Sequence, residues 1–402
     1  MTNNDHLTPV EPPALDKEAS SGTRHLTGIY LKITTTLAIF ISLYAIYSNA
    51  LSNTQEFYRN TIFLSGILIL GFILFPFSKR FSTAKFNGWD YLFIALTLIS
   101  YGYFFFNYVD LHVVRKSIPN TMDYAMAILG IIVLFEAARR TTGYFIPSLA
   151  TFAIIYALFG QYFMGIFGHA GFSVERLLYR LFMTSEGIFG ITLSTASTAI
   201  VVFILFGSFL SVSGATALFN DLALAMAGRR RGGPAQVAVI SSALTGSLSG
   251  SAVANVATTG TFTIPLMKNI GLTSRFAGAV EATASTGGMI MPPIMGAAAF
   301  IMAGFLGISY TTIVIAAIIP ALLYYAALIM AIDIEAKKQG LKGLSKENIP
   351  QVKAVLKARG LLLLPLIIVI GTLLMGKTPI YAGFLGILTI IVADRKSTRL
   401  NS

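Results

Sequence analysis

The sequence predicts an all-α integral membrane protein: a polytopic helical bundle with a re-entrant helical hairpin and a discontinuous helix. Its composition is the first reason, because 55% of the residues are hydrophobic and only 11% are charged, whereas a soluble domain carries about 25% charged residues. The second is a series of apolar runs, many of them close to the roughly 20 residues that a spanning helix needs. The third is a pair of polar, glycine-rich segments, residues 241–263 and 278–300, which interrupt that apolar pattern.

The apolar runs define the expected spans. They cover residues 26–47, 61–77, 89–107, 124–135, 144–163, 188–209, 276–306, 311–333 and 361–375, and a last one begins near Tyr381. A polar tail, residues 1–25, precedes the first run, which is longer than the apolar core of a signal peptide and has no clear small-residue cleavage site. We therefore interpret the first run as a retained helix.

The basic residues set the expected orientation. Cytoplasmic loops of membrane proteins are enriched in Lys and Arg. With a cytoplasmic N-terminus, most of the Lys and Arg of the connecting segments fall inside, and the opposite orientation inverts that ratio. A charged segment, residues 335–360, then reads as a cytoplasmic amphipathic helix, or a pair broken at Pro350. Residues 172–182 read as a similar surface helix on the other side.

The distribution of Lys and Arg also predicts the re-entrant hairpin, residues 232–268. Arg231 and Lys268 both fall inside, yet a single crossing between them would place Lys268 outside. Two full crossings would need about 40 apolar residues and a turn, and this segment is too short and too polar. A hairpin that enters and leaves on the cytoplasmic side fits both facts, with its tip near Ser249, Gly250 and Ser251.

Residues 241–263 contain many Ser, Thr and Gly residues, with Gly246 and Gly250 in a GxxxG pattern. One interpretation is close helix packing through small residues. That interpretation leaves Asn255 and the hydroxyls without a role. The other is a hairpin tip whose freed carbonyls and hydroxyls bind a hard cation such as Na⁺, with Ser249, Ser251 and Asn255 as its ligands. The start of the second arm would point its positive dipole end at an anion.

Residues 278–300 contain Gly287 and Gly288, followed by Pro292 and Pro293. A proline kink is one interpretation of this pattern. Two glycines and two prolines so close together exceed what a kink needs, and proline suits the first turn of a new helix. A discontinuous helix at a binding site near the membrane midplane explains the pattern better.

Glu281 is the one acid placed deep in an expected span. An ionisable group at such a depth is by default a functional candidate, here as the coupling residue of a proton-driven carrier. Two other interpretations stay open from sequence alone: Glu281 reaches the cytoplasmic interface, or it pairs with Arg275, about 9 Å away along the helix. A single acid disfavours a relay of several carboxylates, so Na⁺ is the favoured coupling ion and H⁺ the alternative.

Several function classes are disfavoured. The chain has no Cys, which excludes disulfides and thiolate metal sites. Motifs of hydrolases, zinc peptidases and P-loop enzymes are missing, and the four His residues lie outside both polar segments. The net charge of +12 lies in short clusters between apolar runs, which argues against nucleic-acid binding. The expected function is therefore that of a transporter, with no cofactor; a membrane-embedded enzyme or an assembly scaffold is the alternative of another class.

Three segments carry a resemblance to a known family. GRRRGGPAQVAVISSALTGSLSGSAVANVATTGTFTIPLMKNIG (residues 228–271), RFAGAVEATASTGGMIMPPIMGAAAFIMAG (275–304) and EAKKQGLKGLSKENIP (335–350) resemble the tripartite ATP-independent periplasmic (TRAP) transporter permeases. They look like the first hairpin, the following broken helix and a cytoplasmic segment of the branch in which the small and large membrane subunits are fused. Residues 26–140 are then similar to the four-helix small subunit, and residues 141–393 to the N-terminal part of the large one.

The resemblance implies an elevator-type transporter of the bacterial inner membrane, driven by a cation gradient, usually Na⁺. It implies two partners: a periplasmic binding protein of the TAXI type, and an organic-acid substrate such as a dicarboxylate or an acidic amino acid. An ion-coupled carrier or exchanger without a binding protein is the alternative within transport. The candidate substrate- and ion-binding residues are Ser249, Gly250, Ser251, Asn255, Thr258, Thr286, Gly287, Gly288, Pro292 and Pro293.

The end of the chain reads DRKSTRLNS (residues 394–402). It resembles the translation of a sequencing adapter, and we expect it to be non-native. The family's second hairpin is missing from the sequence, so we also expect the chain to be C-terminally truncated.

Overall fold

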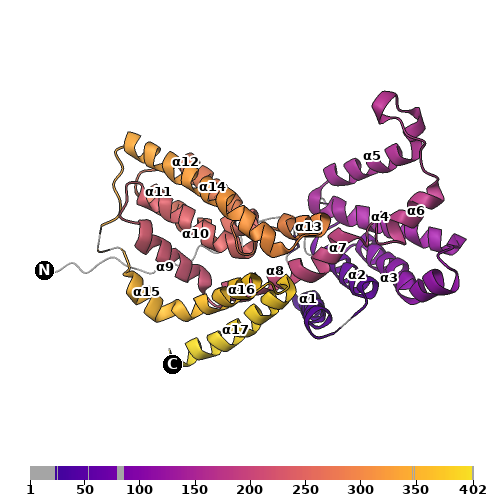
Figure 1. Cartoon of the computed structure of the whole chain (residues 1–402), viewed down its shortest axis with the longest axis horizontal. Helices are drawn as coiled ribbons and strands as arrows, with labels where there is room; N and C mark the ends of the chain where they lie inside the picture. The colour runs from indigo at the N-terminus through magenta and orange to yellow at the C-terminus, as the bar shows by residue number, and fades with distance from the viewer. Residues whose placement is uncertain are drawn as a thin grey trace. The chain divides into compact units, whose positions relative to one another are not determined.

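The computed structural model describes residues 23–24, 26–52, 54–78, 86–345, 347 and 349–400, with side chains up to residue 393. This part of the chain is helical and contains no strand. Eight of its helices are long and apolar enough to cross a membrane. The expected all-α, multi-span fold is confirmed. The chain divides into two compact units, and in Figure 1 the second runs from magenta to yellow except for the indigo segment Ser42–Asn60.

Unit 1 comprises the chain up to Ile41 and residues Thr61–Gly187. Its α3 and α4 each begin with a capping box, formed by Asn87 with Asp90 and by Asn120 with Asp123, which satisfies the free N–H groups of the first turn. The short α6 carries the amphipathic pattern expected for residues 172–182. Its helices are most of α1 (Gly28–Ile46) and of α2 (Glu56–Leu74), and the whole of α3 (Gly88–Val109), α4 (Thr121–Thr142), α5 (Phe145–Phe159) and α6 (Val174–Phe182).

A buried ion cluster holds one end of unit 1 together. Asp90 accepts hydrogen bonds from Arg24 and Arg140, both at 2.6 Å, and the Arg140 Nε donates to Glu136 at 2.7 Å. The guanidinium groups also donate to the last carbonyls of α2, including those of Ile73 and Phe75. Positive charge at a helix C-terminus is stabilising, and each guanidinium satisfies carbonyls that have no partner within the helix.

This cluster corrects the length of the fourth span. The sequence predicted a short run, residues 124–135, because Glu136, Arg139 and Arg140 end the apolar pattern. In the structure α4 continues to Thr142, since these charges pair with one another and with Asp90. The expected N-terminal tail lies outside the described residues except for Thr23 and Arg24, and Arg24 is buried in the fold.

Unit 2 comprises Ser42–Asn60 and the chain from Ile188 onward. Its centre is a bundle in which α10, α11 and α12 pack against one another and α14 packs against α10 and α12 (Figure 1). The helices are α7 (Ile191–Thr195), α8 (Val201–Val212), α9 (Ala215–Ala227), α10 (Gly233–Ser249), α11 (Ala252–Asn269), α12 (Ser274–Gly287), α13 (Ala297–Leu306), α14 (Tyr310–Lys338), α15 (Val352–Arg359), α16 (Leu364–Leu374) and α17 (Pro379–Leu400).

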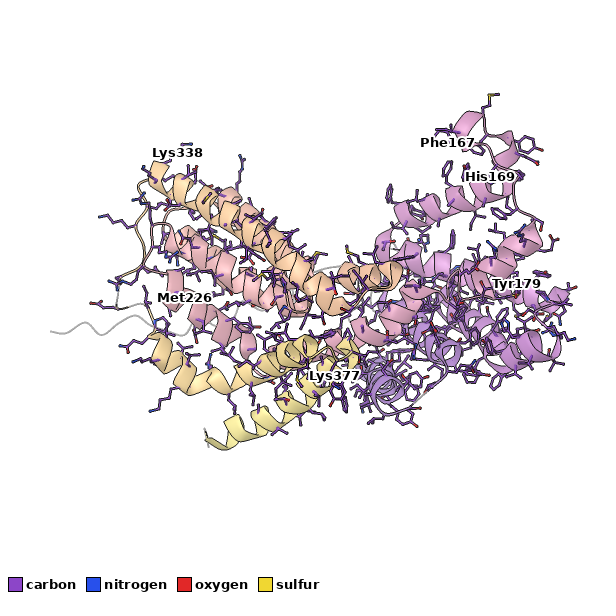
Figure 2. All side chains as sticks on the ribbon, viewed as in Figure 1. Phe167, His169, Tyr179, Met226, Lys338 and Lys377 are labelled. Carbon is purple, nitrogen blue, oxygen red and sulfur yellow. The ribbon has the colours of Figure 1, made fainter. Side chains whose placement is uncertain are left out.

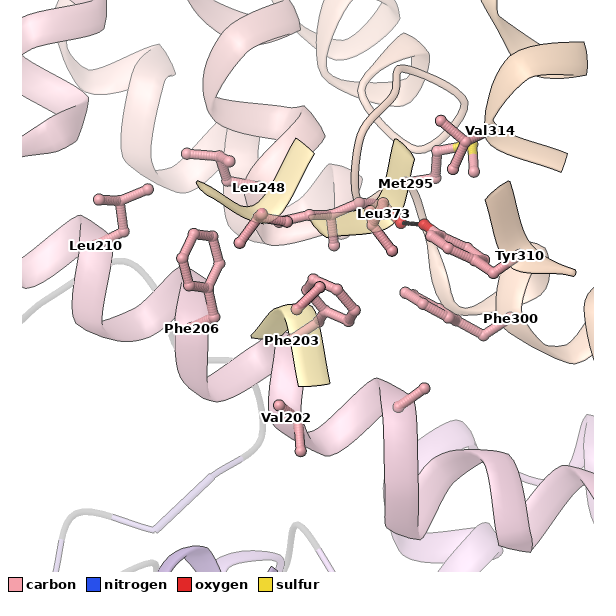
Figure 3. Packing of buried hydrophobic residues seen from close by; sticks show 14 of the residues in the cluster. Val202, Phe203, Phe206, Leu210, Leu248, Met295, Phe300, Tyr310, Val314 and Leu373 are labelled. Carbon is pink, nitrogen blue, oxygen red and sulfur yellow. Dashed lines mark hydrogen bonds between the residues drawn. The ribbon is translucent and has the colours of Figure 1, made fainter. Parts of the chain in front are cut away.

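An apolar cluster supports the end of the α10–α11 hairpin. Leu248 near the hairpin tip, Phe206 on α8 and Met295 in the loop before α13 all belong to it (Figure 3). The rings of Phe300 and Tyr310 stack with centroids 4.2 Å apart, and the Tyr310 hydroxyl donates to the Pro293 carbonyl at 3.0 Å and to that of Ile294. This packing fixes the loop that faces the hairpin tip.

Two expectations for unit 2 were incomplete. The short helix α9 was missed, because its apolar run is below spanning length. The described residues of the charged segment 335–360 do not form one continuous helix: α14 carries the first of them to Lys338, and among the rest that are described the α-helix is Val352–Arg359. Pro350 lies in the non-helical stretch before α15, as its missing backbone N–H favours.

Candidate functional site

Helices α10 and α11 form the helical hairpin that the sequence predicted. α10 ends at Gly250, which adopts φ +62° in the left-handed region, where glycine carries no steric cost. α11 begins directly afterwards, and the Ser251 side chain caps it by accepting from the Ala254 N–H at 3.3 Å. The tip is therefore two residues long, at the predicted position.

The break in the following helix is also present. α12 ends at Gly287 and α13 begins at Ala297, so residues 288–296 form the connection, which contains Gly288, Pro292 and Pro293. Two tyrosines of α14 accompany the end of α12: the Tyr324 hydroxyl donates to the Thr283 carbonyl at 2.8 Å, and that of Tyr325 to the Ala284 carbonyl at 3.0 Å. The Tyr325 bond is buried and the Tyr324 bond is exposed, and together they give donors to two carbonyls in the last turn of α12.

The hairpin tip and the helix break meet through glycines. A Cβ built on Gly246 would lie 2.8 Å from the Cα of Gly288 and 2.7 Å from the Asn255 Nδ2, and one on Gly250 would lie 2.5 Å from the Met295 carbonyl oxygen. Only a residue without a side chain allows these approaches. A cavity of about 220 Å³ lies beside this contact. Its polar side chains are Ser249 and Ser251, and apolar residues of α8, the loop before α13 and α13 line the rest.

Asn255 has an unused acceptor at this contact. Its side chain is fully buried, and its Nδ2 donates to the Ser242 carbonyl at 2.9 Å. Its Oδ1 is buried and has no hydrogen-bond partner among the described residues, and the same holds for the Thr245 hydroxyl. An unpaired buried carbonyl oxygen costs roughly 1–3 kcal/mol. The orphaned Oδ1 is therefore the neutral, hard oxygen that a bound cation would satisfy, and in this respect the residues fit Na⁺.

Glu281 lies in a closed cage of hydroxyl groups between α10, α11 and α12. Its side chain has no exposed surface. Its Oε1 accepts from Thr259 at 2.5 Å, Ser242 at 3.0 Å and Ser285 at 3.2 Å. Its Oε2 accepts from Thr263 at 2.5 Å. Each of these four hydroxyl-bearing residues is itself fully buried.

The cage excludes the two other interpretations of Glu281, a position at the cytoplasmic interface and an ion pair with Arg275. The carboxyl does not reach an interface, because it is fully buried. It also makes no ion pair with Arg275 within the described part of the chain, where its partners are hydroxyls. The arrangement joins both arms of the hairpin to α12 through a single side chain.

The structure brings most of the predicted residues to the hairpin tip or to the helix break and leaves two of them elsewhere. Ser249, Gly250, Ser251 and Asn255 lie at or behind the tip, and Gly287, Gly288, Pro292 and Pro293 lie at the facing break. Thr258 and Thr286 lie instead on the exposed sides of α11 and α12, and their hydroxyls donate to carbonyls of their own helices, at 2.8 Å each.

Sequence reasoning missed the cage residues Ser242, Thr259, Thr263 and Ser285 as partners of Glu281. A usable signal was present, because Asn255, Thr259 and Thr263 recur every four residues and therefore share one face of α11.

Both ends of the hairpin lie against one segment. The Leu344 N–H donates to the Gly228 carbonyl at 2.9 Å before α10, and a Cβ on Gly271, after α11, would lie 3.5 Å from the Leu341 side chain. Lys338, close to this segment, and Lys377 lie at opposite ends of unit 2 (Figure 2). The hairpin thus returns to the end at which it starts, as a re-entrant element does; the membrane side on which it opens stays a prediction.

The hairpin and the helix break both lie within the residues that match a known protein family. The sequence profile described as "Tripartite ATP-independent periplasmic transporter, DctM component" matches residues 129–400. The C4-dicarboxylate TRAP transporter large permease protein DctM of Pseudomonas aeruginosa is 31% identical over 207 residues, 51% of this chain and 46% of that protein. Its Vibrio cholerae namesake is 33% identical over 175 residues, 42% and 38% of the two chains.

A further relative differs in its named substrate. The 2,3-diketo-L-gulonate TRAP transporter large permease protein YiaN of Escherichia coli is 29% identical over 176 residues, 43% of this chain and 40% of that protein. The chain spans less than half the length of each of these three relatives.

Proposed function

Because the chain belongs to the tripartite ATP-independent periplasmic (TRAP) transporter family, to its DctM component, we propose that it forms part of a permease for cation-coupled uptake of an organic acid. The family is one of transporters, and the chain is accordingly not an enzyme. In this proposal the permease lies in the bacterial inner membrane with a cytoplasmic N-terminus, and it receives its substrate from a periplasmic binding protein. The relatives named for C4-dicarboxylates and 2,3-diketo-L-gulonate support an organic anion as the substrate class.

The observation that carries the proposed coupling is the orphaned Oδ1 of Asn255. It is buried where the hairpin approaches the helix break, within a set of Ser and Thr hydroxyls, and it has no donor. Na⁺ is a hard cation, and neutral oxygens of this kind coordinate it. We therefore propose that Asn255, with Ser249 and Ser251 at the tip, contributes to a Na⁺ site. Binding there would favour the closed contact between the tip and residues 288–296.

Glu281 serves a different purpose in this proposal. Four hydroxyl donors already surround its carboxyl group, so it holds the hairpin to α12 and keeps the hairpin and α12 moving as one body. That rigidity suits an elevator-type transport domain. In a proton-coupled mechanism, by contrast, the Glu281 carboxyl would exchange a proton during transport. The uptake experiment described below distinguishes this mechanism from Na⁺ coupling.

The finer assignments follow the same resemblance. We propose that residues 26–140 serve as the small-subunit scaffold of a fused permease and that the binding protein is of the TAXI type. The family match begins at residue 129, within α4, so most of residues 26–140 precede it, which supports a scaffold before the large subunit.

The test is uptake by the intact permease in proteoliposomes, with a labelled C4-dicarboxylate and a purified binding protein outside. Imposed Na⁺ and pH gradients are compared, with and without that protein. The proposal expects uptake with an inward Na⁺ gradient and the binding protein together. Uptake that ignores the binding protein would support a simple carrier or exchanger instead, and uptake driven by a pH gradient without Na⁺ would make Glu281 the coupling residue.

A further inference from the structure

A second cavity lies away from the hairpin tip, between the start of α10 and the C-terminal part of α14. Its volume is about 580 Å³, and its walls are Arg230, Arg231, Gln236, Ile329, Met330, Asp333 and Ile334. The backbone is tightly packed beside it, since a Cβ on Gly232 would lie 2.7 Å from the Ala336 side chain. The segment before α10 is therefore packed directly against α14 beside the cavity.

One polar atom of this cavity is buried without a partner among the described residues, and its charged groups are not paired with one another. Arg230, Arg231 and Asp333 make no ion pair with any described residue. Gln236 is only 4% exposed, and its Nε2 donates to the Arg231 carbonyl at 3.2 Å, but its Oε1 is buried without a donor. The cavity thus combines the guanidinium groups of Arg230 and Arg231 and the Gln236 Oε1, at the start of α10, with the Asp333 carboxylate of α14.

The remaining wall is apolar and belongs to a helix with the length and hydropathy of a membrane span. On α14, Met330 is 60% and Ile334 68% exposed. The charged end of the same helix, with Lys337 and Lys338, follows directly. A cavity with charged groups at a helix end and exposed apolar side chains one turn away has the layout of the boundary between lipid headgroups and acyl chains.

We propose that this cavity binds the headgroup of a phosphatidylethanolamine molecule. The lipid phosphate accepts from the guanidinium groups of Arg230 and Arg231, in charge-assisted bonds. Its ammonium group donates to Asp333 and to the Gln236 Oε1, and one acyl chain follows Met330 and Ile334. The lipid joins the first arm of the hairpin to α14.

Other ligands of similar chemistry fit less well. Phosphatidylcholine carries a quaternary ammonium without an N–H, so it leaves the Gln236 Oε1 without a donor. Phosphatidylglycerol has hydroxyl donors but no positive charge to balance Asp333. Free phosphate matches the arginines alone and leaves the apolar wall uncovered.

The test is native mass spectrometry of the delipidated protein titrated with dioleoyl phosphatidylethanolamine, phosphatidylglycerol or phosphatidylcholine, and with inorganic phosphate. We expect one phosphatidylethanolamine site that binds at least about tenfold more tightly than the other lipids, as the loss of one hydrogen bond to a charged group implies. Asp333→Asn removes this preference and leaves phosphatidylglycerol binding unchanged or tighter, and Arg231→Gln weakens both lipids.

Two matched controls test whether the effect belongs to the cavity. Glu335→Gln on α14 and Arg229→Gln beside Arg230 change charges close by that do not line it, and neither should alter the preference. Equal binding of all three lipids by the unchanged protein, or equal effects of Asp333→Asn and Glu335→Gln, would overturn the assignment. Binding of inorganic phosphate as tight as that of the lipid would replace it with a soluble-anion site. Thermal stability of each variant identifies any that does not fold, and the comparison of lipids on the unchanged protein needs no variant.

Discussion

Replacing Thr263 by Val tests whether the hydroxyl cage around Glu281 holds the hairpin to α12. Val keeps the branched shape of Thr but removes the hydroxyl that lies 2.5 Å from the Glu281 Oε2. Hydrogen bonds between helices in a membrane average about 0.6 kcal/mol and reach about 1.7, while a bond to a charged group in a soluble protein contributes about 1.5–3 kcal/mol. We take the overlap of these two ranges and expect Thr263→Val to destabilise the protein by about 1.5 kcal/mol.

The control for this variant is Thr258→Val on the same helix. The Thr258 hydroxyl donates only to its own helix, at the Ala254 carbonyl, and its side chain is exposed. Its replacement should therefore cost less than about 0.5 kcal/mol. The assay is thermal unfolding in detergent, followed by the fraction that remains monodisperse in size-exclusion chromatography. At about 2–4 °C per kcal/mol for a body of this size, Thr263→Val should lower Tm by about 3–6 °C. Equal Tm values for the two variants would refute the cage as a stabilising contact.

Four more predictions follow from the same structure. Gly246→Ala should push the hairpin away from the helix break and reduce uptake, because its Cβ would lie 2.8 Å from the Gly288 Cα. The control, Gly278→Ala, has open space around its Cβ and should stabilise α12 by about 0.5–1 kcal/mol in the same thermal assay. Tyr325→Phe should destabilise the protein by about 1 kcal/mol in that assay, since the Ala284 carbonyl loses a buried donor. An unchanged Tm would show that this hydrogen bond does not stabilise the end of α12. Asp90→Asn should cost about 3–5 kcal/mol, because it leaves buried Arg24 without a carboxylate and Arg140 with Glu136 alone. Glu186→Gln in the exposed pair with Arg180 should cost less than about 0.5 kcal/mol, and equal costs for the two variants would contradict a structural role of the cluster. Single cysteines at Arg231 and Lys268, in a chain without Cys, should react with an impermeant maleimide only from the cytoplasmic side, and labelling of Lys268→Cys from outside would exclude a re-entrant hairpin.

The parts of the fold that sequence reasoning reached are those set by local chemistry. Gly250 and Ser251 mark the hairpin tip because a glycine that ends one helix and a serine that caps the next are local signals. Gly287 and Pro292 mark the helix break in the same way. The spacing of Arg231 and Lys268 predicted that the hairpin returns to one end, since the positive-inside rule and the length of a span are general constraints.

The parts that sequence reasoning missed depend on long-range pairing. The continuation of α4 past Glu136 requires Asp90 on α3, and no local sequence pattern predicts that Arg140 pairs with Asp90. The partners of Glu281 come from three helices, so their identity follows only from how α10, α11 and α12 pack. Thr258 and Thr286 carry the same hydroxyl group as the cage residues, yet their positions on exposed helix faces separate them from Asn255, and residue type alone does not distinguish the two cases.

The central claim is that Asn255 helps to bind the coupling ion, and Na⁺ titration of uptake by the intact permease tests it most directly. Asn255→Ala removes the buried Oδ1 and should raise the Na⁺ concentration for half-maximal uptake about tenfold, as the loss of about 1.4 kcal/mol of binding energy implies. Thr258→Ala should leave that concentration unchanged, and Glu281→Gln should leave the dependence on Na⁺ in place. The account is contradicted if Asn255→Ala titrates like the unchanged protein, or if a pH gradient drives uptake without Na⁺ and Glu281→Gln abolishes it.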